Sequence, residues 1–386
     1  MSVGFNNLDI GSLVVEQQAG GLLTVDLAAL RANYRLLADR LAPRRVAAVV
    51  KADCYGLGAA HVVSVFHDAG CRDFFVAHLG EGLKIRPLLP ADASIYVLNG
   101  LQTDTEIICA EAGIVPVLNS LEQLRNWAAA SRTAAKALPA VLQVDTGMAR
   151  LGLSPDELDE LAVDLPVLDA IDIRFVMSHL ACADEADNPA NEAQLQRLKN
   201  ILRQLPSVPV AFANSGGAFL HEGFHFDLAR PGVALYGVAP TAGKPNPMRP
   251  VVRLDARVIQ VRSIPEGTPV GYGGSYISQT PMRVATIAIG YADGWPRQLS
   301  NRGSAYFGDM RLPIIGRVSM DSITLDVTAL PEGTLQLGSL VELIGPHQTL
   351  EEVAADCETI PYEILTSLGQ RYSRRYLDAD AASIHP

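Results

Sequence analysis

The fold is decided by a unit that first occurs at VAAVVKADCYGLGAAHVVSVFHDAGCRDFFVAH, residues 46–78. Two short apolar runs flank a segment whose apolar residues recur at three- and four-residue steps, the period of an amphipathic helix. The same alternation continues to about residue 237. The expected strands are VAAVVK (46–51), FFVAH (74–78), IYVLN (95–99), IVPVLN (114–119), AVLQVD (140–145), IRFVMSH (173–179), PVAFANS (209–215) and VALYG (233–237). Eight buried strands separated by helices predict an α/β fold with an N-terminal (β/α)8 TIM-type barrel.

The hydrophobic pattern of the sequence changes after the Gly/Pro-rich link TAGKPNPMRPVV, residues 241–252. Short runs rich in β-branched residues follow it, and the turn signal PEGT occurs at 265–268 and 331–334. This spacing predicts a C-terminal all-β domain, a small barrel, with a last helix-like stretch around 361–372. We therefore expect a barrel at 20–245 and a β-domain at 246–386. Two points stay open: whether an N-terminal extension at 1–19 joins the β-domain, and whether LLTVD (22–26) feeds another sheet.

Composition narrows the class of protein. The 386 residues are 48% hydrophobic and 19% charged, which suits a sizeable core and excludes a disordered or fibrous chain. The formal net charge of -11 and the lack of a basic run argue against nucleic-acid or anionic-membrane binding. The five cysteines are widely spread without a C-x-x-C pair, and neither a secretory signal nor a metal motif is recognisable. These features predict a soluble cytoplasmic protein with free thiols.

Polar side chains follow the predicted strands, where the functional groups of a (β/α)8 barrel collect. They are Lys51, His78, Asn99, Asn119, Asp145 followed by Arg150, His179 and Ser215, with Arg230 just before the last expected strand. Each alone has an ordinary explanation, such as a lysine at a strand end or an arginine in a structural ion pair. Their gathering at one edge of the barrel favours a functional site.

Three of these segments together indicate a cofactor pocket. A lysine that ends a buried strand, as Lys51 does, is partly desolvated, which lowers its pKa and suits it to forming a Schiff base. Near it stands Tyr55, and Asn214-Ser215-Gly216-Gly217 forms a small-residue turn that can cradle a phosphate. Arg230-Pro231-Gly232 adds a fixed cation and a close backbone approach. An amine for an aldehyde beside an amide-lined phosphate site makes a candidate pyridoxal-phosphate pocket.

At VKADCYGLG (50–58) the sequence resembles the alanine racemase family, whose members join a (β/α)8 barrel to a β-domain. Further matching motifs follow in family order over nearly the whole chain. They are LTVDLAALRANYRLL (23–37), VDTGMARLG (144–152), MSHLA (177–181), NSGG (214–217), ARPGVALYG (229–237), VGYGGSY (270–276), IGYADG (289–294), GRVSMD (316–321) and IPYE (360–363).

The resemblance implies a racemase, an isomerase of L- and D-alanine that uses two bases. Lys51 resembles the lysine that carries pyridoxal phosphate, and Tyr272 the opposing tyrosine contributed by the partner subunit of a homodimer. His179 matches the histidine behind that tyrosine, and Arg230 the arginine that faces the pyridine nitrogen.

Further residues match positions that bind the cofactor or the substrate. The cofactor-binding positions are Tyr55, Asn214, Ser215, Gly232, Val233 and Tyr362 at the phosphate, with Arg150 near the phenolic oxygen. The substrate positions are Arg150, Met320 with its backbone N–H, and Tyr291 at the entrance. No metal is implied.

The sequence departs from the family pattern at three positions. Leu57 stands where many members carry histidine, and Cys54 where many carry alanine. Gln143 replaces a lysine that many members carbamylate and pair with the arginine at 150. Because an amide cannot be carbamylated, we expect a neutral hydrogen bond to hold Arg150 instead.

Other functions remain open on the residues alone. GLGAAH (56–61) imitates the glycine-rich loop of a dinucleotide-binding dehydrogenase, but His61 stands in place of its third glycine. A barrel-type decarboxylase would share Lys51 but lack the β-domain motifs, and a non-catalytic pyridoxal-phosphate carrier would need only the barrel. Within racemases, alanine is the expected substrate. Serine turnover and the choice between a catabolic role and D-alanine supply for the cell wall stay open.

Overall fold

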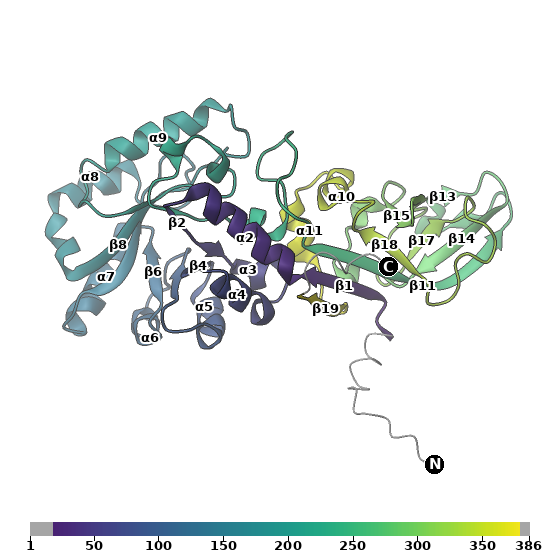
Figure 1. Cartoon of the computed structure of the whole chain (residues 1–386), viewed down its shortest axis with the longest axis horizontal. Coiled ribbons are helices and arrows are strands. Elements are labelled where there is room, and N and C mark those ends of the chain that lie inside the picture. The colour runs from purple at the N-terminus through teal and green to yellow at the C-terminus, as the bar shows by residue number, and fades with distance from the viewer. Residues whose placement is uncertain (1–17, 379–386) are drawn as a thin grey trace, which may run out of the picture. The chain divides into compact units, whose positions relative to one another are not determined.

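The computed structural model describes residues 18–378, which form two compact units (Figure 1). One unit is the continuous stretch Ala29–Arg249, and the other combines the residues up to Ala28 with those from Pro250 onward. The stretch 20–28, expected in the barrel, therefore belongs to the second unit. The expected extension at 1–19 lies almost entirely outside the described residues.

The Ala29–Arg249 unit is a parallel β-barrel. Its strands are β2 (Arg45–Val46), β3 (Ala48–Val49), β4 (Asp73–Val76), β5 (Ser94–Val97), β6 (Val115–Leu118), β7 (Leu138–Gln143), β8 (Ile171–Met177), β9 (Val210–Ala211) and β10 (Leu228–Ala229). They follow the order β2-β10-β9-β8-β7-β6-β5-β4-β3. Only Ala47 separates β2 from β3, and its N–H donates to the carbonyl of Ala229 at 2.9 Å. The two short strands thus form one continuous stretch that closes the ring.

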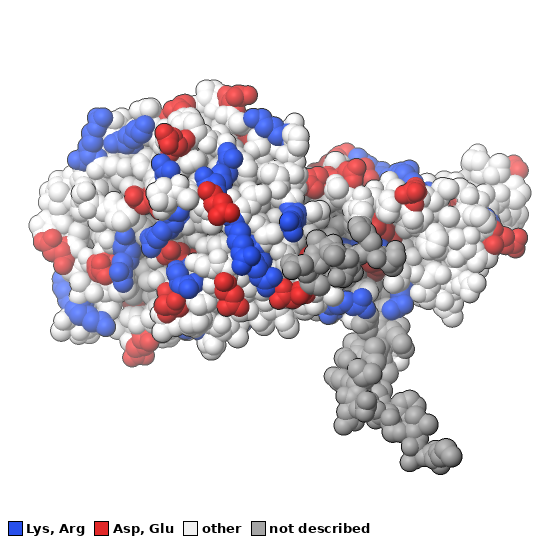
Figure 2. Space-filling model, in the orientation of Figure 1, with Lys and Arg blue, Asp and Glu red and all other residues white. Residues whose placement is uncertain are grey.

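Helices surround these strands (Figure 1). They are α2 (Leu27–Leu41), α3 (Lys51–Tyr55), α4 (Ala59–Asp68), α5 (Leu79–Ile85), α6 (Glu106–Glu111), α7 (Leu121–Thr133), α8 (Pro155–Val163) and α9 (Pro189–Ile201). Several begin at side-chain caps: Ser120 accepts a hydrogen bond from the N–H of Gln123, and Ser154 forms a capping box with Glu157. On the face shown in Figure 2, basic and acidic side chains are interspersed over this unit.

The eighth strand is not where the sequence places it. VALYG (233–237) was expected to be a strand, but Val233–Tyr236 is a 3₁₀ helix, and the barrel closes through β10 instead. Pro231 has no N–H for a ladder, and the hydroxyl of Ser215 accepts the N–H groups of Gly232 (2.9 Å) and Ala234 (3.3 Å). A run that is buried on all sides has no period that separates strand from helix. Arg230 consequently follows the last strand rather than preceding it.

The second unit is mainly β-structure. Its strands are β1 (Gly21–Asp26), β11 (Val252–Ile264), β12 (Pro269–Val270), β13 (Tyr276–Ile277), β14 (Met282–Ile287), β15 (Ser304–Phe307), β16 (Met310–Pro313), β17 (Ile323–Asp326), β18 (Leu340–Ile344) and β19 (Ser373–Leu377). Two short helices, α10 (Leu350–Asp356) and α11 (Pro361–Ser367), precede β19. β1 pairs antiparallel with β11 and parallel with β19, so LLTVD (22–26) does feed this other sheet.

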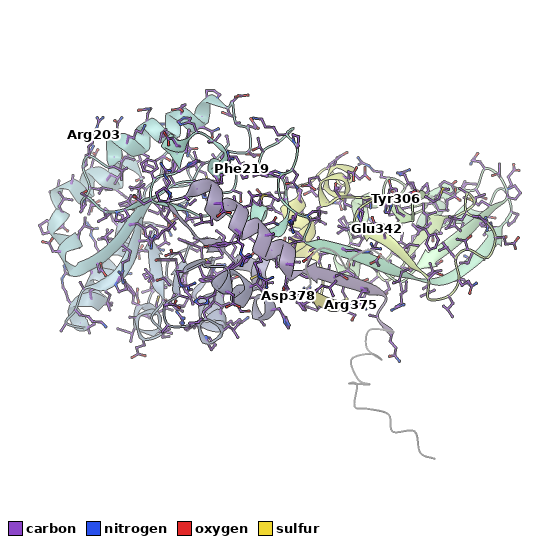
Figure 3. The ribbon with its side chains drawn as sticks, in the orientation of Figure 1. Arg203, Phe219, Tyr306, Glu342, Arg375 and Asp378 are labelled. Carbon is purple, nitrogen blue, oxygen red and sulfur yellow. The ribbon has the colours of Figure 1, made fainter. Side chains whose placement is uncertain are left out.

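Pairing in this unit closes a small barrel, as the spacing predicted. β11 pairs with β14, β14 with β17, β16 with β15, β15 with β18 and β18 with β11. The bridge between Ile314 and Leu325 joins the end of β16 to β17 and completes the circuit. Tyr306 and Glu342, labelled in Figure 3, are register partners on β15 and β18. The buried Glu342 carboxylate accepts the backbone N–H of His347 at 2.8 Å.

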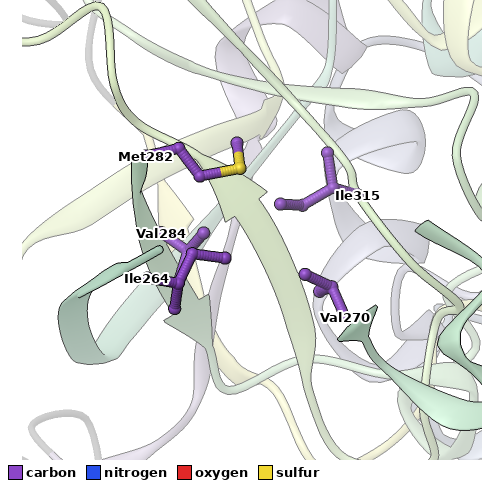
Figure 4. Packing of buried hydrophobic residues seen from close by; sticks show 5 residues of the cluster. All are labelled: Ile264, Val270, Met282, Val284 and Ile315. Carbon is purple, nitrogen blue, oxygen red and sulfur yellow. The ribbon is translucent and has the colours of Figure 1, made fainter. Parts of the chain in front are cut away.

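A compact apolar cluster lies in this unit (Figure 4). It contains Ile264, Val270, Met282, Val284 and Ile315, which come from β11, β12, β14 and the stretch after β16. Tyr276 packs against it. The cluster anchors the two strands, β12 and β13, that carry the loop with Tyr272.

Across the described part of the chain, we find no helix that combines the length and the apolar character needed to cross a bilayer.

Candidate active site

Lys51 lies immediately before a strained turn. Although α3 is helical by its hydrogen bonds, Ala52, Asp53, Cys54 and Tyr55 have φ of 53°, 55°, 56° and 54°, in the left-handed region. A non-glycine residue in that conformation costs roughly 1–2 kcal/mol, so four in a row need support from their surroundings. Such strain is characteristic of functional sites, and here it follows the lysine directly.

Two carboxylates support this turn. Oδ1 of Asp53 accepts the N–H of Ala59 at 2.7 Å, which ties the turn to the start of α4. Oε1 of Glu81, on α5, accepts the N–H of Ala52 at 2.7 Å. The backbone next to Lys51 is therefore fixed from two neighbouring helices.

Charge and burial lower the pKa of Lys51. Burial is the largest cause, the charge of Arg150 acts in the same direction, and the carboxylate of Glu81 acts against them. A lysine of lowered pKa holds more of its amine in the neutral, nucleophilic form near neutral pH.

His179 lies in the same cationic neighbourhood. Burial lowers its pKa to about 3, assisted by the charges of Arg230, Arg150 and Lys51. The imidazole is therefore neutral at physiological pH. All three charges act on the imidazole, so Lys51, Arg150 and Arg230 lie in the neighbourhood of His179.

Arg230 has a donor without a partner. Its Nη2 donates to the carbonyl of Ser178 at 2.7 Å, while its buried Nη1 has no hydrogen-bond partner. Burial lowers the pKa of this guanidinium to about 10, which still leaves it protonated at neutral pH. Buried polar groups are almost always satisfied, so an orphaned guanidinium N–H at the carboxyl ends of the strands indicates a place for an acceptor atom of a ligand.

A buried network behind His179 fixes the end of β8. Gln194, on α9, donates to the carbonyl of His179 at 2.9 Å and to Oγ1 of Thr146 at 3.2 Å. Its Oε1 accepts the N–H of Ala181 at 2.9 Å, and the hydroxyls of Thr146 and Ser178 are 2.8 Å apart. This network positions both the imidazole and the carbonyl that holds Arg230.

A small-residue cradle lies between two strand ends. The hydroxyl of Ser215 ties down the loop that contains Gly232, and a Cβ on Gly232 would stand 2.3 Å from the hydroxyl oxygen of Tyr55. The ring of Tyr55 packs against that of Tyr236, with 4.6 Å between the ring centroids. The hydroxyls of Tyr55 and Ser215 thus converge at Gly232, whose N–H donates to Ser215, and hydroxyl groups of this kind can bind a phosphate.

Two further barrel residues expected at the phosphate, Asn214 and Val233, have different surroundings. The side chain of Asn214 donates to the carbonyl of Leu180 at 3.1 Å and accepts the N–H of Gly217 at 2.9 Å, so it shapes the turn. Val233 is the first residue of its 3₁₀ helix, where an N–H has no partner within the helix.

Arg150 ends a loop that its own neighbours organise. Asp145 accepts three backbone N–H groups from residues 147–149, at 2.8 to 3.0 Å. The buried Gln143 donates to the carbonyl of Leu151 at 3.3 Å. A neutral hydrogen bond from Gln143 therefore reaches the loop of Arg150.

Tyr272 projects from the β-domain on a loop built of glycines. Its side chain is 71% exposed. Gly271, Gly273 and Gly274 all have positive φ, between 55° and 72°, a conformation that glycine adopts without a Cβ penalty. Val270, immediately before them, is anchored in the apolar cluster of Figure 4.

Tyr291 and Met320 lie side by side in the β-domain. The N–H of Tyr291 donates to the carbonyl of Ser319, and that of Ala292 to the carbonyl of Met320, both at 3.0 Å. A Cβ on Gly290 would stand 2.3 Å from the carbonyl oxygen of Met320, so only glycine permits this approach.

An ion pair and a hydrogen bond tie the loop of Tyr291 to the segment that contains the helix of Tyr362. Asp293 is buried, and Arg371 binds its two oxygens through Nε at 2.6 Å and Nη2 at 2.8 Å. Tyr362 lies on α11, whose last residue, Ser367, donates to the carbonyl of Gly294 at 3.0 Å. The structure therefore groups Tyr291, Met320 and Tyr362 within the β-domain.

The barrel residues fit pyridoxal phosphate on three observations. Lys51 offers an amine of lowered pKa, Gly232 admits the hydroxyl of Tyr55 where a Cβ would collide with it, and Arg230 has a buried N–H without a partner. The amine suits the aldehyde of the cofactor, the surroundings of Gly232 suit its phosphate, and the free N–H of Arg230 suits a ring nitrogen or oxygen.

Sequence reasoning missed the residues that hold these groups in place. Glu81, Gln194 and Arg371 act on the backbone or on a carboxylate far from them in sequence. Glu81 alone left a local signal, because it occupies the third position of a helix that follows a strand, as in a capping box.

Comparisons with known families match both units. Residues 25–240 match the family model described as alanine racemase, N-terminal domain, and residues 251–376 match alanine racemase, C-terminal domain.

Individual relatives and solved structures agree with these matches. An alanine racemase of Brucella canis is 61% identical over 372 residues, covering 93% of this chain and 94% of its own. A catabolic alanine racemase of Agrobacterium fabrum is 58% identical over 365 residues, covering 94% of each chain. The crystal structure of alanine racemase from Bartonella henselae with covalently bound pyridoxal phosphate superposes with a TM-score of 0.91. It shares 48% sequence identity and covers 93% of this chain and 100% of that one.

Proposed function

Because the chain belongs to the alanine racemase family, we propose that it interconverts L- and D-alanine with Lys51 and Tyr272 as bases on opposite faces of the substrate. The reaction is a racemisation, catalysed by an isomerase, and the cofactor is pyridoxal phosphate. When bound, this cofactor draws electrons from the α-carbon of the attached amino acid, so that its hydrogen can leave as a proton. The observation that carries the proposal is a lysine of lowered pKa that shares the neighbourhood of His179 with Arg230 and its unpartnered N–H.

Two bases are needed because one base would return the proton to the face from which it came. Lys51 takes or gives the proton on one face, and its lowered pKa keeps its amine available for that step. Tyr272 serves the other face. A tyrosine that acts as a base near pH 7 needs its anion stabilised by about 4 kcal/mol, since an ordinary phenol has a pKa of about 10.

His179 and Arg230 supply that stabilisation. His179 is neutral, so it contributes a hydrogen bond, and the positive charge comes from Arg230 behind it. Arg230 stays protonated throughout, which also makes it a poor proton donor to any group that it faces.

The other residues bind and orient. Arg150 binds the phenolic oxygen, Met320 binds the substrate carboxylate, and Tyr291 lines the entrance. The phosphate is bound by Tyr55, Ser215, Asn214, Gly232, Val233 and Tyr362. The convergence of Ser215, Gly232 and Tyr55 supports the phosphate assignment.

The assembly we propose is a homodimer in which each β-domain completes the partner's site. The exposed position of Tyr272 on its glycine loop supports this arrangement. We also propose a cytoplasmic location, which the five unpaired cysteines favour because disulfides are rare in a reducing compartment.

Incubation of the purified protein with L-alanine tests the reaction. We expect D-alanine to accumulate to about an equal mixture, with a visible cofactor absorbance that borohydride fixes on Lys51. The variant Lys51→Ala should lose both. Release of carbon dioxide without D-alanine would indicate the decarboxylase alternative. Cofactor binding without any turnover would indicate a non-catalytic pyridoxal-phosphate carrier.

Tyr272→Phe tests the assignment of faces. Intrinsic α-deuterium effects and rates of the chemical step should show a larger loss for proton removal from L-alanine than from D-alanine. Tyr276→Phe, a few residues along the same loop region, is the matched control and should leave both directions unchanged. Equal slowing of both directions in Tyr272→Phe contradicts the assignment.

A further inference from the structure

The carboxylate of Glu81 joins two strand-end loops of the barrel. Its Oε1 accepts the N–H of Ala52 at 2.7 Å, next to Lys51. Its Oε2 accepts the N–H of Ala77 at 2.7 Å and that of His78 at 3.2 Å. Both oxygens are therefore used, one on each loop, and α5 itself is capped by the same group.

The loop that Glu81 holds at Ala52 is the strained one. Ala52 is the first of the four successive left-handed residues, and its N–H belongs to the peptide group that follows Lys51, so an anchor there restrains the backbone from which the lysine side chain extends. The same turn carries Tyr55, whose ring is fixed against Tyr236 and whose hydroxyl faces Gly232. An anchor at Ala52 therefore acts on both the amine and the phosphate end of the pocket.

We propose that Glu81 is a positioning residue for the reaction, because its carboxylate ties the left-handed turn to β4 and so places Lys51 and Tyr55. This inference rests on the proposed role of Lys51. Glu81 does not itself contact the reacting atoms. It acts through the backbone of Ala52 and through its negative charge, which opposes the lowering of the Lys51 pKa.

An amide cannot replace this carboxylate. Glu81→Gln offers one acceptor oxygen and one NH2 group, so at least one loop faces a donor where it needs an acceptor. Glu81→Asp keeps the charge but is one methylene shorter, so it cannot span both loops. The two variants thus separate the loss of charge from the loss of reach.

The chain provides a matched control at Glu157. This carboxylate also joins two barrel segments: Oε1 accepts the N–H of Leu121 and Oε2 that of Ser154, both at 3.0 Å. It caps α8 in the same way as Glu81 caps α5. Glu157→Gln therefore removes equivalent bonds without touching the turn after Lys51.

Hydrogen exchange on the full-length, cofactor-bound protein is the first readout. In Glu81→Gln and Glu81→Asp, peptides that cover Ala52 and Ala77 should exchange on the order of tenfold faster, and Glu157→Gln should not change them. The second readout is the pH titration of the visible cofactor absorbance. Its midpoint should fall in Glu81→Gln, because a negative charge has been removed, and stay in place in Glu81→Asp and Glu157→Gln.

Turnover completes the test. We expect kcat to fall on the order of tenfold in both Glu81 variants with little change in KM, since positioning acts on the chemical step. Unchanged exchange at Ala52, or equal effects of Glu81→Gln and Glu157→Gln on exchange and titration, would overturn the proposal. If Lys51→Ala keeps the cofactor absorbance, the proposed function of Lys51 fails, while exchange at Ala52 still reports whether Glu81 holds the turn.

Discussion

Replacing Gly232 by alanine should weaken cofactor binding through one steric clash, between the new Cβ and the side chain of Tyr55. The added Cβ would stand 2.3 Å from the hydroxyl oxygen of Tyr55 and 3.2 Å from the ring carbon that bears it. Since Cβ atoms do not approach other atoms within 3.0 Å, the hydroxyl must retreat from the cradle. Val49, 3.5 Å away on the other side, leaves the new methyl little room to shift instead.

The magnitude follows from the bond that is lost. A hydrogen bond from a hydroxyl to a charged phosphate contributes about 1.5–3 kcal/mol, and 1.4 kcal/mol is a factor of ten in affinity. We therefore expect the dissociation constant for pyridoxal phosphate to rise roughly 10- to 100-fold in Gly232→Ala. Titration of the apoprotein, followed by the visible absorbance, measures it. Gly80→Ala is the control, because nothing lies within 4 Å of a Cβ at that position.

A double variant sharpens the test. Tyr55→Phe removes the oxygen that collides with the new Cβ, so Gly232→Ala should cost less in that background than alone. The two effects should therefore combine to less than their product. The reasoning is refuted if affinity is unchanged in Gly232→Ala, or if the two losses multiply fully.

Two further predictions concern stability. The pKa of folded His179, about 3, lies below the ordinary value of 6.5, so the unfolded chain gains a proton first as the pH falls. The free energy of unfolding should therefore fall below pH 6.5 by up to about 1.4 kcal/mol per pH unit. Urea unfolding measures it, and the fall should be smaller in His179→Gln. Equal pH dependence of the two proteins contradicts this prediction. Arg371→Ala removes the guanidinium that pairs with the buried Asp293. Because Arg371 is half exposed and Asp293 keeps the N–H of Gly290, we expect a cost of about 1–2 kcal/mol in thermal unfolding, with partial recovery in Arg371→Lys. A loss below about 0.5 kcal/mol would mean that water replaces the guanidinium.

The barrel was predictable because its apolar runs repeat with helices between them, and that pattern reports burial. The eighth strand was not. β10 has only two residues, too few for a period, whereas the longer VALYG run at 233–237 is buried as a 3₁₀ helix after Pro231. A prediction based on burial alone therefore assigned the eighth strand to the wrong segment. The pairing of LLTVD (22–26) with β11 and β19 depends on partners more than 220 residues away, which no local pattern contains.

The candidate site was predictable to the extent that its residues carry chemistry in their type and order. Lys51, Ser215 and Arg230 follow strands, and the motifs of the family gave each a proposed role. The left-handed turn after Lys51 has no sequence signature, because Ala, Cys and Tyr avoid that conformation and Asp adopts it only occasionally, as a single residue. Glu81 and Gln194 bind backbone groups brought near them only by the closed barrel.

The position of β1 between β11 and β19 has a consequence for synthesis. This strand leaves the ribosome long before its two neighbours, β11 and β19, which both follow residue 250. The barrel is thus an insertion inside the β-domain, and it can complete its own ring while the β-domain still awaits its partners. A fragment that starts at Pro250 would leave β11 and β19 with open edges, inviting association with other chains.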